Sequence, residues 1–487
     1  MKYLANWALN AAVQRGASYA DVRVVAQRSR ALSTKNGKVG SASDGESVGM
    51  SVRVIADGAW GFAASAELAR AAVEATAARA VEIARASARV KRADIQLAPE
   101  KPAVAEWSTP IEIDPFSISV EQNIDLLLKI DAELRSVQGI TLAETNLNFN
   151  REEQWFCSSE GADIHQTKIS TGAGYAAYAF AANEIQKRSY PNSFGGQWQN
   201  KGYELVGELR LLENARRIAE EALALHKADQ CPEGKFDIIL DSSQLGLQIH
   251  ESVGHPIELD RVLGMEANFA GTSFLTLEKL RTLRYGSELV NVVADARQEH
   301  GPGLGTFAYD DEGVAAQCTP IISNGLFTGY LSSRETAHTI GETRSGGTLR
   351  AEGWNRLPMI RMTNISILPG EKPLSLEQLI ASTEHGILMQ TNRSWSIDDK
   401  RYNFQFGCEI GWEIKNGKRT RMVKNPSYSG ITTEFWNSMD AICSRDEWTL
   451  WGTPNCGKGQ PQQVMGTGHG AAPARFRGIK VGTAFKS

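Results

Sequence analysis

The segment with the clearest chemical potential is QLGLQIHESVGHPIELD, which holds His250, Glu251 and His255. The whole chain of 487 residues has only eight His, so this close grouping of two His with an acid stands out. Neutral imidazole is a good zinc ligand near pH 7, and a carboxylate beside a ligand can take a proton from an attacking water. The pattern favours metal-assisted hydrolysis, with His250 and His255 as ligands and Glu251 as general base.

The five-residue spacing of the two histidines requires a departure from regular helix. In the His-Glu-x-x-His zinc motif the ligands are four residues apart and share one helix face. Five residues on a regular α-helix leave the side chains about 140° apart, too far to hold one ion. Gly254 is typical of a helix end, and Pro256 disfavours the helical conformation at His255. We therefore predict that the helix stops near Gly254 and that His255 turns back toward His250.

A catalytic zinc site needs a third protein ligand, and the residues alone leave several candidates. They are Asp260, the acidic cluster Asp310, Asp311 and Glu312, His469 and Cys456. Cys456 lies in TPNCGKGQP, a composition that predicts a turn, and Lys458 there would favour the thiolate. These features give Cys456 a modest advantage over a carboxylate.

Structural roles are the alternative interpretation for the other candidates. The acidic cluster at 310–312 fits a solvated turn as well as it fits a set of residues that orient the ligands. Arg361 and Asn364 could bind a substrate backbone, but structural roles are favoured for both. A structural role is also favoured for His469.

The elements that must position these residues follow from periodicity. Residues 49–65 alternate as strand around Asp57-Gly58, a hairpin signal, and an Ala-rich helix follows at about 66–88. A second helix is predicted at 118–137, strands at 139–182 and a third helix at 203–227. The second half opens with the buried-strand pattern FDIILD, a helix from about residue 243, and short β-like segments beyond residue 300.

This order predicts an α+β fold with two domains. An N-terminal α/β domain spans 1–229, and a β-rich C-terminal domain that carries the metal-binding helix spans 230–487. The boundary is placed at ADQCPEGKFD, which carries Pro and Gly and no periodicity.

Composition excludes several function classes. Hydrophobic residues make up 42% and the net charge is −4, which argues against an extended basic face for nucleic acid. The sequence shows no run of 18 apolar residues and no secretory signal pattern, so we expect a cytoplasmic protein without a membrane span. Its six scattered Cys fit free thiols or ligands better than a disulfide framework.

Taken together, the motifs resemble the TldD/PmbA metallopeptidases, and the TldD-type catalytic subunit in particular. The resemblance rests on segments in the same order along almost the whole chain: GASYADVRV, GMSVRVIADGAWGFAAS, HESVGHPIELD, YDDEGVAAQCTPI, RMTNISILPGE, NCGKGQP and RGIKVG. The segment 385–410 departs from the family pattern, which leaves substrate preference open but not the metal site.

The resemblance implies one Zn²⁺ per chain, held by His250, His255 and Cys456, with Glu251 as the catalytic residue. It also implies unfolded or small peptides as substrates, and a dimer around an enclosed cavity. That dimer would be a homodimer or a heterodimer with a PmbA-type subunit. No nucleic acid or membrane partner is expected.

Two other functions stay open at this level. A zinc-holding subunit for peptide binding or maturation, without hydrolysis, would have a closed four-ligand site. A Cys-nucleophile amidase or peptidase would use Cys456 with a nearby His and would not depend on metal.

Overall fold

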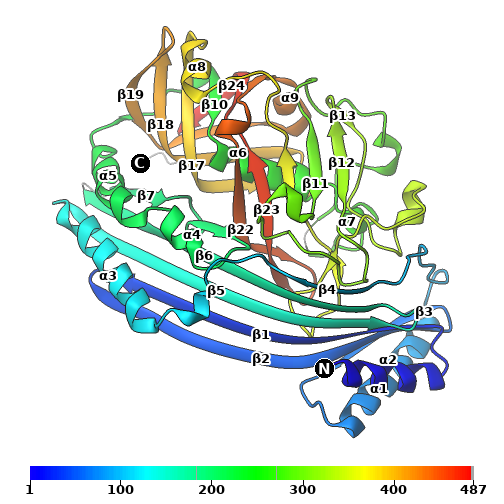
Figure 1. Cartoon of the computed structure of the whole chain (residues 1–487). Coiled ribbons are helices and arrows are strands. Elements are labelled where there is room, and N and C mark those ends of the chain that lie inside the picture. Colours follow the sequence, from blue (N-terminus) through cyan, green and yellow to red (C-terminus); the bar gives the residue numbers. More distant parts are fainter. Residues whose placement is uncertain (182–183, 270, 484–487) are drawn as a thin grey trace.

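The structure is a computed structural model that describes residues 1–181, 184–269 and 271–483. A long, curved sheet from the N-terminal half runs along one side of the molecule, and a β-rich C-terminal half packs against it (Figure 1). The predicted α+β class is confirmed. The predicted domain boundary after residue 229 falls within the short strand β9, and it stays a prediction.

The N-terminal sheet has the order β3-β2-β1-β5-β6-β4, with β7 and β8 also paired to β6. Its strands are β1 Tyr19–Lys35, β2 Lys38–Ala56, β3 Ala59–Ser65, β4 Val104–Ser108, β5 Ile140–Ser158, β6 Asp163–Ala181, β7 Glu184–Tyr190 and β8 Gln197–Gln199. The pairing is antiparallel except between β4 and β6. The predicted Asp57-Gly58 turn is confirmed between β2 and β3.

Helices cover one face of this sheet. They are α1 Lys2–Gln14, α2 Arg70–Ala88, α3 Val120–Ser136, α4 Glu204–Glu208 and α5 Leu211–Ala224. Because side chains alternate along a strand, Val22, Val24 and Leu32 of β1 point to the same face. Val22 and Val24 pack in the core with α1 and α2, and Leu32 packs in the core with α3 and α5.

The opposite face of β1 meets the C-terminal half through buried polar contacts. Arg23 pairs with Asp311 (Nη1–Oδ2 3.2 Å), and Arg53 of β2 pairs with Glu312 (Nη2–Oε1 3.4 Å). Asp310 accepts hydrogen bonds from the backbone N–H groups of Glu312, Val314 and Leu349. The acidic cluster is therefore neither a solvated turn nor a support for the metal ligands, because it joins the two halves of the molecule.

A small barrel forms the centre of the C-terminal half. Strands β17, β10, β24, β20 and β18 pair in this order, and β18 pairs back with β17. The strands of this sheet are β9 Asp229–Gln230, β10 Gly234–Leu240, β17 His385–Ile397, β18 Asn403–Lys415, β19 Lys418–Lys424, β20 Pro426–Ile431, β21 Met439–Ile442 and β24 Ala474–Thr483.

Smaller sheets and helices surround the barrel. The strands are β11 Val292–Asp295, β12 Cys318–Ser323, β13 Leu326–Phe327, β14 Leu349–Arg350, β15 Met359–Ile360, β16 Ile365–Ile367, β22 Thr449–Lys458 and β23 Gln463–Ala471. The α-helices are α6 Ser242–Ile249, α7 Leu259–Val262, α8 Leu376–Ala381 and α9 Thr432–Asn437. Short 3-10 turns occur at Pro115–Ser117, Leu277–Lys279, Gln298–His300, Ala337–Ile340 and Arg445–Glu447.

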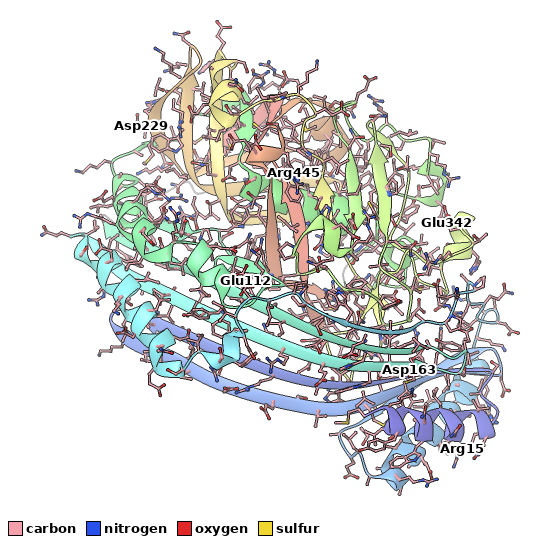
Figure 2. The ribbon with its side chains drawn as sticks, viewed as in Figure 1. Arg15, Glu112, Asp163, Asp229, Glu342 and Arg445 are labelled. Atoms are coloured by element: carbon pink, nitrogen blue, oxygen red, sulfur yellow. The ribbon has the colours of Figure 1, made fainter. Side chains whose placement is uncertain are left out.

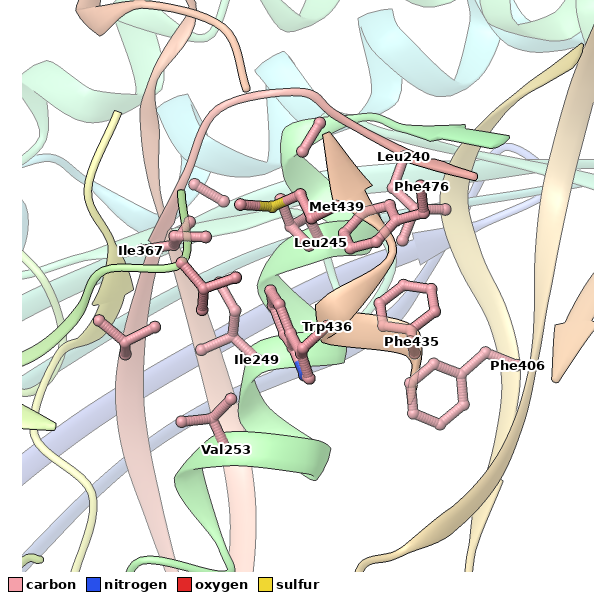
Figure 3. Close-up of a cluster of buried hydrophobic side chains, with 14 of the residues drawn as sticks. Leu240, Leu245, Ile249, Val253, Ile367, Phe406, Phe435, Trp436, Met439 and Phe476 are labelled. Carbon is pink, nitrogen blue, oxygen red and sulfur yellow. The ribbon is translucent and has the colours of Figure 1, made fainter. Parts of the chain in front are cut away.

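Helix α6 is the element on which the site depends. Asp241 caps its first turn by accepting from the N–H of Gln244. Leu245, Ile249 and Val253 follow at intervals of four residues, so they share one face, which packs into a cluster that includes Trp436 and Phe476 (Figure 3). This apolar face fixes the rotation of α6 and turns His250 toward the hairpin β22–β23, where His469 lies 2.7 Å from it.

Charged side chains such as Asp229 and Glu342 project at the outside of the molecule (Figure 2). Among the described residues, no helix combines the length and the apolar character needed to cross a membrane.

Candidate metal centre

The two histidines are brought together by a widened helical turn. Helix α6 continues as a π-helix over His250–Gly254, and the N–H of His255 donates to the carbonyl of His250 (3.1 Å). A π-turn places residues five apart nearly above one another, and the two rings lie 4.8 Å apart. The predicted end of the helix near Gly254 agrees with the structure. The predicted cause is wrong, because His255 keeps helical angles (φ −66°, ψ −43°) despite Pro256.

Cys456 lies within reach of this pair. Its Sγ is 3.8 Å from Nε2 of His255, and one ligand atom from each of His250, His255 and Cys456 falls within 4.8 Å of the others. Two ligands on one tetrahedral zinc ion are about 3.5 Å apart, so the His255–Cys456 separation fits that donor set. The predicted turn at Cys456 is wrong: this residue belongs to strand β22 and pairs with Met465 of β23.

His250 is held by His469, which we expected to be only structural. Nδ1 of His469 lies 3.1 Å from the carbonyl of Ile365 and must donate there, so its Nε2 accepts from Nδ1 of His250 (2.7 Å). This assignment leaves the Nε2 lone pair of His250 free for an ion. A partner of this kind fixes the tautomer and the ring orientation of a metal ligand.

His255 is oriented in the same way by Glu258. Its Nδ1 lies 3.1 Å from Oε2 of Glu258, so Nε2 is the lone pair that faces Cys456. Lys458 donates to Asp260 (2.7 Å) and lies 3.4 Å from Glu258. Lys458 therefore pairs with both carboxylates, and Asp260 does not belong to the group of possible ligands that the described residues form.

The electrostatic environment suits metal binding. Burial lowers the pKa of both His250 and His255, which keeps the imidazoles neutral near pH 7. Burial by itself would raise the pKa of Cys456, but His255 and Arg361 outweigh it and bring this pKa below 9.0. The guanidinium of Arg361 donates to the backbone carbonyl of Cys456, so its charge sits beside the thiolate.

Glu251 lies beside the ligands and pairs with Arg401 (Oε2–Nη1 2.6 Å). Oε1 of Glu251 has no hydrogen-bond partner among the described residues. Burial lowers the pKa of Arg401, while the Glu251 carboxylate opposes that change. The Glu251 carboxylate is thus fixed through one oxygen and free at the other.

Arg401 was missed as a site residue from the sequence, and His469 was considered as a third ligand but judged to be structural. They reach Glu251 and His250 from 150 and 219 positions away along the chain. His469 carried one weak signal, since it is one of only eight His in the chain. Asn364, also considered for substrate, instead holds the backbone of Gly305 and Asp295.

A cavity of about 590 Å³ lies between the N-terminal sheet and the hairpin that carries Cys456. Its wall includes Pro454 and Met465, which flank Cys456 in that hairpin, and the charged side chains of Lys168 and Arg350. The cavity therefore borders the hairpin that carries Cys456, although His250, Glu251, His255 and Cys456 are not among its lining residues.

Comparisons with known proteins agree with this architecture. The PmbA/TldA metallopeptidase models match as domain 1 over residues 20–84, as the central domain over 113–226 and as the C-terminal domain over 233–483. The chain belongs to the PmbA/TldA metallopeptidase family, which confirms the predicted relationship.

Relatives along most of the chain have names of the same kind. Metalloprotease MJ0996 of Methanocaldococcus jannaschii is 30% identical, covering 93% of this chain and 95% of the relative. A metalloprotease of Methanothermobacter thermautotrophicus is 30% identical over 95% of both chains. The metalloprotease TldD homolog of Haemophilus influenzae is 26% identical over 94% of this chain and 92% of the relative.

Solved structures share the fold at low sequence identity. A putative modulator of DNA gyrase from Thermotoga maritima superposes with a TM-score of 0.77 at 18% identity, covering 99% of both chains. TldE from Thermococcus kodakarensis superposes with a TM-score of 0.71 at 14% identity, again over 99% of both chains.

Proposed function

We propose that this chain is a zinc-dependent peptidase in which His250, His255 and Cys456 hold one Zn²⁺ and Glu251 is the general base. The observation that carries the proposal is the donor set: two imidazoles and the sulfur of Cys456 converge, and Glu251 follows His250 in the same π-turn. Softness and a tetrahedral preference make zinc the best match to these donors. Three protein ligands leave a fourth position open, as catalytic zinc sites require.

An ion at this centre would polarise a carbonyl and lower the pKa of a bound water to about 7. The residues of the chain supply the remaining steps. Oε1 of Glu251 takes the proton of the attacking water and delivers it to the leaving amine. His469 and Glu258 keep the two imidazoles in the tautomers that turn Nε2 inward.

Small or unfolded peptides are the proposed substrates. The cavity beside the Cys456 hairpin supports this assignment, because it has both polar walls and enough volume for a short extended peptide. Pairing of two such chains, or of this chain with a PmbA-type subunit, is proposed from the family membership and from the likeness to TldE.

The test combines metal analysis with peptide cleavage. We expect about one zinc per chain, loss of cleavage on chelation, and recovery when zinc is returned. Glu251→Gln should keep the zinc and lose about 10²–10⁴-fold in kcat, since general-base catalysis contributes that much. Cys456→Ser should lose zinc, whereas Cys443→Ser, a buried thiol elsewhere in the core, serves as the matched control. Normal cleavage by Glu251→Gln would refute the proposed mechanism.

The contact between Cys456 and His255 also favours a second candidate, a cysteine nucleophile paired with an imidazole. That enzyme would be inactivated by thiol alkylation and would keep its activity in a chelator. A non-hydrolytic zinc subunit would instead bind peptides, keep one zinc and cleave nothing. Zinc content, cleavage in a chelator, sensitivity to thiol alkylation and peptide binding together separate all of these functions.

A further inference from the structure

Arg401 comes from an unusual turn between β17 and β18. It has left-handed backbone angles (φ 64°), which are uncommon for any residue other than Gly and tend to persist where the surroundings impose them. Asp398 pins the turn by accepting from the N–H groups of Tyr402 and Asn403, and the hydroxyl of Thr432 donates to the Arg401 carbonyl. The turn is therefore built to present this side chain.

The guanidinium of Arg401 is only partly satisfied. Its side chain is 16% exposed, and Nη1 binds Oε2 of Glu251. Its Nε is buried and has no hydrogen-bond partner among the described residues. An unpaired donor on a buried cation is costly, so its retention beside the candidate centre points to a ligand that completes it.

The chemistry of that ligand follows from the position. Arg401 is close enough to act electrostatically on both His250 and His255. With one nitrogen held by Glu251, a fixed positive charge stands beside the proposed general base, and negative charge developing on an attacked carbonyl near that base would be attracted to it. Donors aimed at developing charge each contribute about 10²–10³-fold to kcat in acyl transfer.

We propose that Arg401 stabilises the oxyanion formed at the scissile carbonyl while holding Glu251 in place. This inference rests on the proposed peptidase function. Water attacks the carbonyl carbon, its proton passes to Glu251, and the π electrons move onto the carbonyl oxygen, which accepts from Arg401. The double bond then re-forms, the C–N bond breaks, and the nitrogen takes the proton from Glu251. Arg401 donates hydrogen bonds throughout and is not consumed.

The left-handed backbone makes a clean variant available. Gly adopts φ near 64° without strain, so Arg401→Gly removes the guanidinium without straining the backbone of the turn, although loss of the buried pair with Glu251 should lower the melting temperature. Arg401→Lys keeps the positive charge but loses the planar arrangement of several N–H donors that a guanidinium provides. Lys400→Met is the matched control, because it removes an exposed positive charge from the adjacent position.

The assay measures zinc content, kcat, KM and the affinity for a phosphinic peptide, whose tetrahedral oxygens imitate the oxyanion. Arg401→Gly should keep its zinc, lose about 10²–10³-fold in kcat and change KM by less than about threefold. Its affinity for the phosphinic peptide should fall in proportion to kcat/KM, while affinity for the product peptide stays the same. Arg401→Lys should be intermediate, and added methylguanidinium should partly restore the Gly variant. Lys400→Met should match the wild type with or without methylguanidinium.

The results separate this inference from the proposed function. If Arg401→Gly matches the wild type in kcat and in phosphinic-peptide affinity, while Glu251→Gln is inactive, the role of Arg401 is overturned and the peptidase stands. If neither chelation nor Glu251→Gln affects cleavage, the peptidase mechanism falls and takes this inference with it. A loss of zinc in Arg401→Gly, without rescue by methylguanidinium, would show a structural role instead and would also overturn it.

Discussion

The hydrogen bond between His250 and His469 can be tested with His469→Ala. When an ion occupies Nε2 of His250, the ring proton must sit on Nδ1, where His469 accepts it at 2.7 Å. The substitution leaves the Ile365 carbonyl without this donor and leaves that N–H with only the Thr467 hydroxyl at 3.5 Å, at about 1–3 kcal/mol each. Because the cost at His250 is specific to the metal-bound tautomer, it appears in the metal affinity.

The expected loss of zinc affinity is about 10–100-fold, or about 1.4–2.7 kcal/mol. Competition against a chromophoric chelator measures it directly. The cost at Ile365 is independent of metal and should appear as a lower unfolding midpoint of the zinc-free protein in urea.

His226→Ala is the matched control, since His226 also binds a backbone carbonyl, that of Ala179, far from the centre. It should leave the zinc affinity unchanged. A zinc affinity of His469→Ala within twofold of the wild type, in a protein that remains folded, would refute the assigned role of His469 and the tautomer derived from it.

Three further predictions follow from the contacts. Glu258→Gln should weaken zinc binding about 10–100-fold, because His255 loses the carboxylate that orients it. It should also cost about 3–5 kcal/mol in urea unfolding, because the buried cations Arg261 and Lys458 lose their partner. An unchanged unfolding midpoint would contradict this. Gly254→Ala should lower the melting temperature and the zinc content together, because its Cβ would lie 2.2 Å from Sδ of Met362. The pKa of Asp398 is lowered because hydrogen bonds from Asn403 and backbone N–H groups outweigh its burial, so its stabilisation exists above pH 3.8 and disappears as pH falls through the lowered pKa. Asp398→Asn should thus cost about 1–2 kcal/mol at pH 7 and nothing in strong acid, as pH-dependent urea unfolding would show.

Short-range sequence patterns were enough to predict the helices of the N-terminal half, because residues close in the chain define where these helices begin and end. The helix predicted at 118–137 is α3, Val120–Ser136, and Ser119 and Gln122 form its capping box. The predicted helix at 203–227 is divided into α4 and α5, because Arg210 between them takes a left-handed conformation (φ 47°). The closed barrel could not be predicted from the sequence. Strand β10 pairs with β24 more than 230 residues away, and no short-range pattern encodes such a pairing.

The site shows the same division between local and distant information. The cluster of His250, Glu251 and His255 is visible as a motif because one helical turn carries all of it. The π-turn was not predicted. A residue before Pro usually avoids helical angles, but tertiary packing keeps His255 helical here. Gly254 admits Met362 against the widened turn, and the N–H of His255 still finds a helical acceptor.

The groups that control the motif come from separate elements of the C-terminal half. Helix α6 brings the histidines, β22 brings Cys456, β23 brings His469, and the β17–β18 turn brings Arg401. None of these positions is fixed until the barrel has closed and the β22–β23 hairpin has docked on α6, so the donor set forms only in the folded C-terminal half. An ion bound there then stabilises the folded state alone, because the unfolded chain offers no comparable set. The buried polar groups around the centre are costly without that ion, and each imidazole is accordingly held by a second residue, His250 by His469 and His255 by Glu258.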